Sequence, residues 1–233
     1  MDHSGDCFVD ECAGEYNFGG MIHFADDSCD CFVRNSNLWA SSADRYQYGI
    51  YSNGSPVKLA GSKLVGYAGA GVYAGGAPVD VQSNQFDGCA IGVQGAGGGS
   101  IISNNAFNGR GSVLNGTALI SMTPPPPGLA GFVESYVING NRVEDDSAPQ
   151  NPTVLLAHSA TGVLSGNSFH KQNISSTGTS AFIIDVEGGE GEAAAGILIS
   201  SNSFRAAGQL AGSQAIAPGF KGMAANNLGA PSR

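Results

Sequence analysis

The chain has 233 residues, of which 36 are glycine and only 12% are charged, and its 19 acidic and 10 basic side chains give a net charge of -9. An average domain has about 25% charged residues, so this surface is poor in charge. The negative balance argues against nucleic acid and anionic membranes as main partners. No apolar run is long enough to span a membrane, and the first residues lack a signal-peptide pattern, which indicates a soluble chain without an export address.

The N-terminal section holds four of the five cysteines and a local duplication. The segment Asp6-Cys7-Phe8-Val9 reappears as Asp30-Cys31-Phe32-Val33, which predicts two stacked strands with Cys7 beside Cys31. Neighbouring strands lie about 4.8 Å apart, and this spacing is compatible with a disulfide. Buried thiols are the preferred interpretation, because a thiol behaves as a small hydrophobe. The cysteine spacings do not match common zinc modules, so no metal site is predicted.

A six-residue pattern, clearest in Val81 to Phe86, recurs along the rest of the chain. It consists of an apolar residue, two small or polar residues, a polar residue, any residue and a second apolar residue. The polar fourth positions are Ser36, Ser62, Asn84, Asn105, Asn141, Asn167, Asn202 and Asn226. A repeat of roughly 20–50 residues indicates a stacked array in which each copy forms one turn.

Short strands flank each copy of the pattern. Segments such as Val57-Lys58-Leu59 and Val79-Asp80-Val81 alternate between apolar and polar residues, and a second strand begins at the last apolar position. After a variable loop comes a third apolar segment, as in Gly49-Ile50-Tyr51 and Gly71-Val72-Tyr73. Each turn is therefore expected to contain three strands. Asparagine enters the left-handed region easily, so we expect the fourth position to make the bend, with stacked amides bonded to one another.

Three other segments leave this pattern. Residues 39 to 48 form an inserted loop rich in polar and aromatic residues, a usual place for binding groups. Pro124 to Pro127 predict an extended excursion, either a solvated spacer or a docking arm. Glu144-Asp145-Asp146 and the segment Glu187 to Ala195 are acidic, and we interpret both as solvated loops because neither has a known Ca²⁺-binding pattern.

Three short strands per turn, an asparagine bend and stacked Phe or Leu residues resemble the right-handed parallel β-helix of the pectate-lyase-like superfamily, from about Cys7 to Leu228. The expected fold is an all-β, single-stranded solenoid of eight to nine rungs. It would form one domain over 1–233, with a Cys-rich N-terminal rung over 1–30, regular rungs over 31–228 and a tail over 229–233. The superfamily contains pectate and alginate lyases, polygalacturonases, uronan epimerases and bacteriophage tailspikes and other virion proteins, so the fold alone does not decide the function.

The resemblance also suggests where a ligand would lie. In the superfamily, substrate commonly lies along the sheet whose strands follow the variable loop. The outward positions on that sheet are predicted to be His23, Tyr51, Tyr73, Gly92, Ile120 and Leu155. The first three would form an aromatic strip against which sugar rings can pack, with Trp39, Tyr46 and Tyr48 as further glycan-binding residues.

A catalytic site would need carboxylates beside this strip. Asp26 or Asp27 with Asp44 is the grouping that the repeat places on one face, with Arg45 and His23 as the basic candidates. An inverting hydrolase would require two such carboxylates about 6.5–9.5 Å apart. The polygalacturonase motifs are absent as a set, and no pectate-lyase basic cluster is present.

The preferred function is therefore a receptor-facing or structural β-helix protein of a bacteriophage virion, a spike, fibre or capsid decoration that binds glycan. No amphipathic helix covers the open sheet edges before Cys7 or after Leu228, so we expect either a piece of a longer protein or an oligomer whose ends are covered by partners. The resemblance suggests a homotrimer located in the virion. The alternatives are a secreted polysaccharide lyase, hydrolase or epimerase, and a bacterial surface adhesin. We expect no cofactor.

Overall fold

The computed structural model describes residues 6–15, 20–24, 30–40, 48–95, 98–109, 118–122, 135–147, 151–156, 161–172, 182–186, 196–206, 215–217 and 220–229. All regular elements within these ranges are β-strands or isolated bridges. None of these residues forms a helix that is long and apolar enough to cross a membrane.

The strands form three sheets, here called A, B and C. Sheet A contains β1 (Cys7–Asp10), β4 (Cys31–Arg34), β7 (Val57–Ala60), β10 (Val79–Gln82), β13 (Ser100–Ser103), β16 (Ser135–Asn139), β19 (Thr161–Ser165), β22 (Gly196–Ser200) and β24 (Met223–Ala225). Sheet B contains β2 (Ala13–Glu15), β5 (Asn37–Trp39), β8 (Lys63–Val65), β11 (Gln85–Asp87), β14 (Ala106–Asn108), β17 (Arg142–Asp145), β20 (Ser168–Lys171) and β23 (Ser203–Ala206). Sheet C contains β3 (Gly20–Phe24), β6 (Tyr48–Ser52), β9 (Ala70–Ala74), β12 (Ile91–Gly95), β15 (Ile120–Met122), β18 (Val154–Leu156) and β21 (Ile184–Val186).

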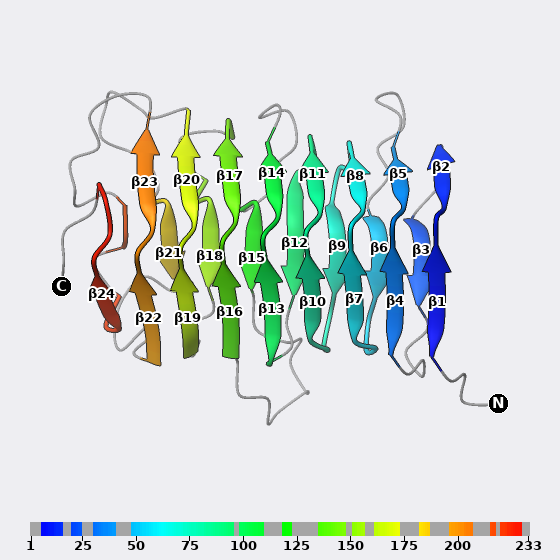
Figure 1. The fold of residues 1–233 in the computed structure, drawn as a ribbon, viewed down its shortest axis with the longest axis horizontal. Helices are drawn as coiled ribbons and strands as arrows, with labels where there is room; N and C mark the ends of the chain where they lie inside the picture. Colours follow the sequence, from blue (N-terminus) through cyan, green and yellow to red (C-terminus); the bar gives the residue numbers. More distant parts are fainter. Residues whose placement is uncertain are drawn as a thin grey trace.

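Neighbouring strands within a sheet are three apart in chain order, except for β22 and β24 of sheet A, which are two apart. Each complete turn therefore adds one strand to every sheet. The named strand pairs run parallel, and Figure 1 shows the turns following one another along the long axis from blue to red. This arrangement confirms the predicted parallel β-helix with three strands per rung. The N-terminal rung is confirmed too, because β1 pairs with β4 and Cys7 lies opposite Cys31.

Side chains on the corner between sheets A and B form a buried hydrogen-bond ladder. The Asn84 backbone N–H and Nδ2 donate to Asn105 Oδ1 at 2.9 and 3.0 Å, and Asn105 Nδ2 donates to the Val81 carbonyl at 2.8 Å. The same bonds link Asn105, Asn141, Asn167 and Asn202 in sequence. Because these amides are buried and bonded, each rung holds the next at a fixed register.

Two details of this corner differ from the prediction. The left-handed residue is the one before the ladder position, not the ladder residue itself. The left-handed positions are Glu11, Asn35, Gly61, Ser83, Asn104, Gly140, Gly166, Ser201 and Asn226. The last ladder member is consequently Asn227, which accepts the Asn202 N–H at 3.0 Å, and the assignment of Asn226 was wrong.

Stacked apolar side chains fill the coil. The rings of Phe86 and Phe107 lie 4.8 Å apart with an interplanar angle of 6°. Each buried phenylalanine contributes on the order of 1.5–3 kcal/mol. A Cβ at Gly92 would lie 2.5 Å from Phe107 Cδ1, so this glycine faces the core and leaves room for the ring.

One acidic segment is structural, contrary to our interpretation of it as a solvated loop. Asp145 and Lys171 are only 0% and 1% exposed, and their charged atoms lie 2.9 Å apart. Asp145 also accepts hydrogen bonds from Thr153 Oγ1 and the Ser147 N–H, while Lys171 donates to the Asn151 carbonyl. A buried ion pair persists when further hydrogen bonds of this kind satisfy both partners.

Replacement of a ladder amide tests the dependence of the fold on this corner. Asn105→Ala should lower the free energy of unfolding by about 3 kcal/mol or more, since it removes the bonds to the Val81 carbonyl and to the Asn84 N–H in a buried site. Asn105→Ser should cost less, because Ser62 Oγ already accepts the Ser36 N–H at the same position. Denaturant unfolding measures both, with Asn108→Ala on the outer face of β14 as the control. Equal losses for the alanine and serine variants would contradict the ladder's role.

The buried ion pair allows a second test. Lys171→Met leaves the Asp145 carboxylate buried without its cation and should cost about 3–5 kcal/mol. Asp145→Asn combined with Lys171→Met should recover part of this loss. Lys58→Met is the matched control, because Lys58 pairs with Asp30 at 3.0 Å on the surface, where an ion pair contributes about 0–1 kcal/mol. Thermal unfolding that ranks the two lysine variants equally would refute this assignment.

Candidate functional site

The predicted aromatic strip exists on the outer face of sheet C. Strand pairing places His23 beside Tyr51 and Tyr51 beside Tyr73 on β3, β6 and β9. The rings of Tyr51 and Tyr73 are stacked, with centroids 5.1 Å apart and an angle of 7°, and His23 meets Tyr51 edge-on at 5.0 Å. The three rings lie in line because a parallel β-helix repeats the same position once per rung.

Tyr48 widens this strip. Its ring lies 5.2 Å from Tyr51 and 5.1 Å from Tyr73, tilted against both. Burial raises the pKa of Tyr48, and the neighbouring Tyr51 adds to this effect. Burial likewise raises the pKa of Tyr73, with further contributions from Tyr51 and Tyr48. The Tyr48 and Tyr73 phenols therefore stay protonated at neutral pH and present apolar faces with hydroxyl tips, as a sugar-binding platform requires.

Beyond Tyr73 the column differs from the prediction. The register continues through Gln94, Ser121, Leu155 and Asp185, so Gln94 and Ser121 occupy the register positions expected for Gly92 and Ile120, although Ser121 is itself fully buried. Gly92 faces Phe107 in the core, and Ile120 is fully buried. The aromatic strip therefore ends at Tyr73, while the prediction for Leu155 is confirmed.

Several predicted residues cannot be placed on this surface. Asp26, Asp27, Asp44, Arg45 and Tyr46 lie outside the residues that the structure describes. Trp39 lies on β5 of sheet B, where it pairs with Val65, and so belongs to a different sheet from the strip. The catalytic role of the aspartates and of His23 stays a prediction.

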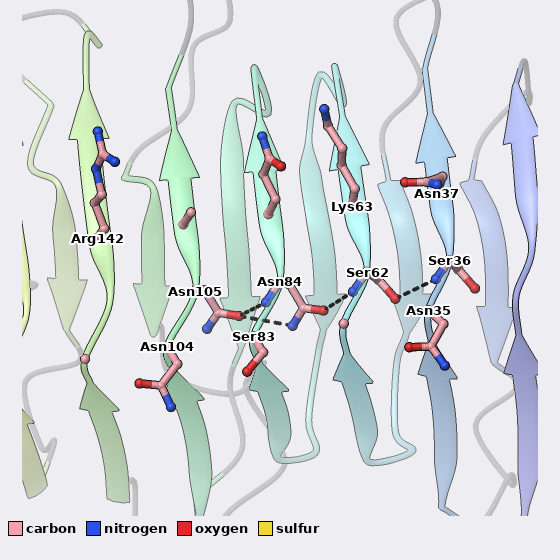
Figure 2. Close-up of a pocket in the computed structure, with 14 residues that line it drawn as sticks. Asn35, Ser36, Asn37, Ser62, Lys63, Ser83, Asn84, Asn104, Asn105 and Arg142 are labelled. Atoms are coloured by element: carbon pink, nitrogen blue, oxygen red, sulfur yellow. Dashed lines mark hydrogen bonds between the residues drawn. The ribbon is translucent and has the colours of Figure 1, made fainter.

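A second candidate site lies along the corner between sheets A and B, and the sequence did not indicate it. Here the surface is hollowed into a corner groove of about 620 Å³ that runs across five rungs (Figure 2). Its floor is the ladder corner, and its walls are side chains from the left-handed positions and from the first residues of the sheet B strands. The lining residues are Asn35, Ser36, Asn37, Gly61, Ser62, Lys63, Ser83, Asn84, Gln85, Asn104, Asn105, Ala106, Gly140 and Arg142.

Charged side chains flank one end of this groove. Arg142 donates to Glu144 at 3.2 Å, and His170 Nδ1 lies 2.7 Å from the other oxygen of the same carboxylate. Partial burial raises the pKa of Glu144, but the hydrogen bonds from His170 and Arg142 outweigh this effect, and the net pKa is lowered. Glu144 is thus a carboxylate at neutral pH.

Within the ranges that the structure covers, no group of three or more His, Cys, Asp or Glu side chains has a metal-binding arrangement.

Comparison with known families agrees with this geometry. Residues 20–215 match the family described as right handed beta helix region. The chain belongs to this right-handed β-helix family. The match covers most of this β-helix, including β3 to β9 with the aromatic strip and all five rungs of the corner groove. No curated protein and no solved structure matches the chain.

Proposed function

We propose that this β-helix is a receptor-facing structural protein of a bacteriophage particle, a spike, fibre or capsid decoration, which binds cell-surface glycan along the aromatic strip. The observation that supports it most is the parallel stack of Tyr51 and Tyr73, extended by Tyr48 and His23. Aligned rings on a rigid sheet suit repeated sugar units, because neither the backbone nor the neighbouring rings must rearrange on binding. The rival proposal is a secreted lyase, hydrolase or epimerase that acts on an acidic glycan.

An apolar column on sheet A supports an oligomer as the functional form. Outward positions there are occupied by Ile101, Val137, Val163, Leu198 and Met223, one per rung. Val137 and Met223 are 36% and 63% exposed. Burial of such a stripe is favourable, and further copies of the same chain would present the same rung spacing. We therefore propose a homotrimer in which this column faces the partner copies.

The strip is tested by glycan binding. Tyr51→Ala with Tyr73→Ala should strongly reduce retention on a panel of bacterial surface polysaccharides, since it removes both stacked rings. Phe8→Ala with Phe32→Ala is the matched control, because these two rings are also stacked, 4.8 Å apart, but lie on sheet A. If the tyrosine variant binds as well as the parent, the strip is not the glycan site. Release of reducing ends or unsaturated uronates in the same assay would favour the enzyme.

Light scattering tests the oligomer. The parent should have three times the 23.5 kDa mass of the chain. Val137→Glu with Leu198→Glu should yield a single-chain mass, because two carboxylates would be buried in the contact. Lys58→Glu, at an outward position of the same sheet, should leave the mass unchanged. A monomeric parent would remove the trimer proposal.

A further inference from the structure

We infer that the corner groove is a second glycan site, which binds an acidic polysaccharide lying parallel to the axis of the β-helix and held at its carboxylates or sulfates by Lys63 and Arg142. The groove lies between sheets A and B, whereas the aromatic strip lies on sheet C. This inference therefore goes beyond the proposed function and does not depend on it.

The shape of the corner groove suits a linear chain. Its left-handed positions, one per rung, are Asn35, Gly61, Ser83, Asn104 and Gly140. Four rung spacings of about 4.8 Å give a length of about 19 Å. A volume of about 620 Å³ spread over this length makes a long, shallow channel, which fits an extended oligosaccharide better than a compact small molecule.

Two glycines keep the channel open. A Cβ at Gly61 would lie 3.0 Å from Asn35 Oδ1, and a Cβ at Gly140 would collide with Asn104 Oδ1. Both glycines have positive φ, 60° and 63°. The two glycines thus have no side chain at the places that the Asn35 and Asn104 amides of the neighbouring rungs occupy. Figure 2 shows the labelled Asn35, Ser83 and Asn104 beside the corner, with Lys63 and Arg142 along the adjoining strands.

The chemistry of the lining matches sugar hydroxyl groups. Asn37, Gln85 and Asn104 present side-chain amides at outward or corner positions, and Ser83 adds a hydroxyl group. An amide both donates and accepts hydrogen bonds, as a sugar hydroxyl group does. The ladder amides Asn84 and Asn105 are buried in the floor and bonded to one another, so they give the channel rigidity and are not themselves available.

The charge of the lining indicates an acidic ligand. The whole chain has 19 acidic and 10 basic residues, yet the groove lining contains Lys63, Arg142 and no carboxylate. Both cations occupy the same outward column of sheet B, on β8 and β17, three rung spacings or about 14 Å apart. Two cations that far apart suit a polymer with charges on separate units.

Neighbouring carboxylates do not neutralise these cations firmly. Lys63 Nζ lies 4.0 Å from Asp87, and the Arg142 side chain is 72% exposed with a 3.2 Å contact to Glu144. Exposed ion pairs of this kind contribute only about 0–1 kcal/mol. Each cation can turn toward a ligand anion, and Arg142 can then bind a carboxylate through two parallel hydrogen bonds.

The test uses oligogalacturonate as a linear uronate probe and dextran oligomers as the neutral probe, measured by calorimetry. The parent should bind oligogalacturonate, with affinity that falls as salt is added, and should bind dextran at least tenfold more weakly. Lys63→Glu with Arg142→Glu should weaken oligogalacturonate binding at least tenfold. Lys221→Glu with Arg205→Glu makes the same change in net charge at exposed residues outside the groove and should leave affinity within about twofold.

Ala106 allows a test that removes no cation. It lies on β14 between Gln85 and Arg142 in the groove wall, with an outward side chain. Ala106→Lys should strengthen oligogalacturonate binding and Ala106→Glu should weaken it, each by about threefold or more, with unchanged thermal unfolding. Opposite effects of the two variants separate a binding role from a structural one.

The inference would be overturned by no binding of oligogalacturonate by the parent, by equal binding of dextran, or by equal loss of affinity in the groove variant and its charge-matched control. Tyr51→Ala with Tyr73→Ala distinguishes the two sites. If this variant keeps its affinity for oligogalacturonate, the groove is supported, whether or not the variant loses retention on the polysaccharide panel. If it loses that affinity while the groove variant keeps it, the groove is refuted and the strip is the uronate site.

Discussion

The buried amide ladder is the interaction on which this β-helix depends. Each ladder asparagine bonds twice to the preceding rung: its side-chain oxygen accepts a backbone N–H, and its side-chain nitrogen donates to a strand carbonyl. Asn105 makes these two bonds with the Asn84 N–H and the Val81 carbonyl. The bonds repeat once per turn, so rungs are coupled mainly to their nearest neighbours, as in other solenoids. The stacked rings of the core and the aligned rings of the strip both follow from the register that these amides impose.

The repeat was predictable because its chemistry is visible in the sequence. A polar residue followed two positions later by an apolar residue, usually Phe or Leu, marks the corners, and that spacing was sufficient to predict the rungs and the sheets. The Asp-Cys-Phe-Val duplication predicted the Cys7–Cys31 alignment. The exact bend was not predictable. Asparagine suits both the left-handed position and the ladder position, and Asn226 and Asn227 are adjacent, so the sequence contains no feature that separates the two roles.

The two candidate sites also differ in how far the sequence predicted them. His23, Tyr51 and Tyr73 were predicted correctly as a strip because each directly follows or precedes an apolar residue that the alternation places in the core, as Tyr51 follows Ile50. Gln94 was missed, since β12 is an apolar and glycine-rich segment without clear alternation, and Phe107 decides which way Gly92 faces. The corner groove was missed because no segment encodes it. It consists of side chains from five turns that only the three-dimensional register brings together.

The connection between sheets A and B has the same length in all eight turns that the structure describes, whereas the other connections vary. Two residues separate β10 from β11 and two separate β13 from β14, but β11 and β12 are three residues apart and β14 and β15 eleven. Longer loops cost little in closure entropy. A foreign peptide grafted between β14 and β15 would therefore be displayed on the outside of the coil without shifting one rung against the next. The chain could serve as a scaffold in which the connection between sheets A and B is kept at two residues and the other connections are redesigned.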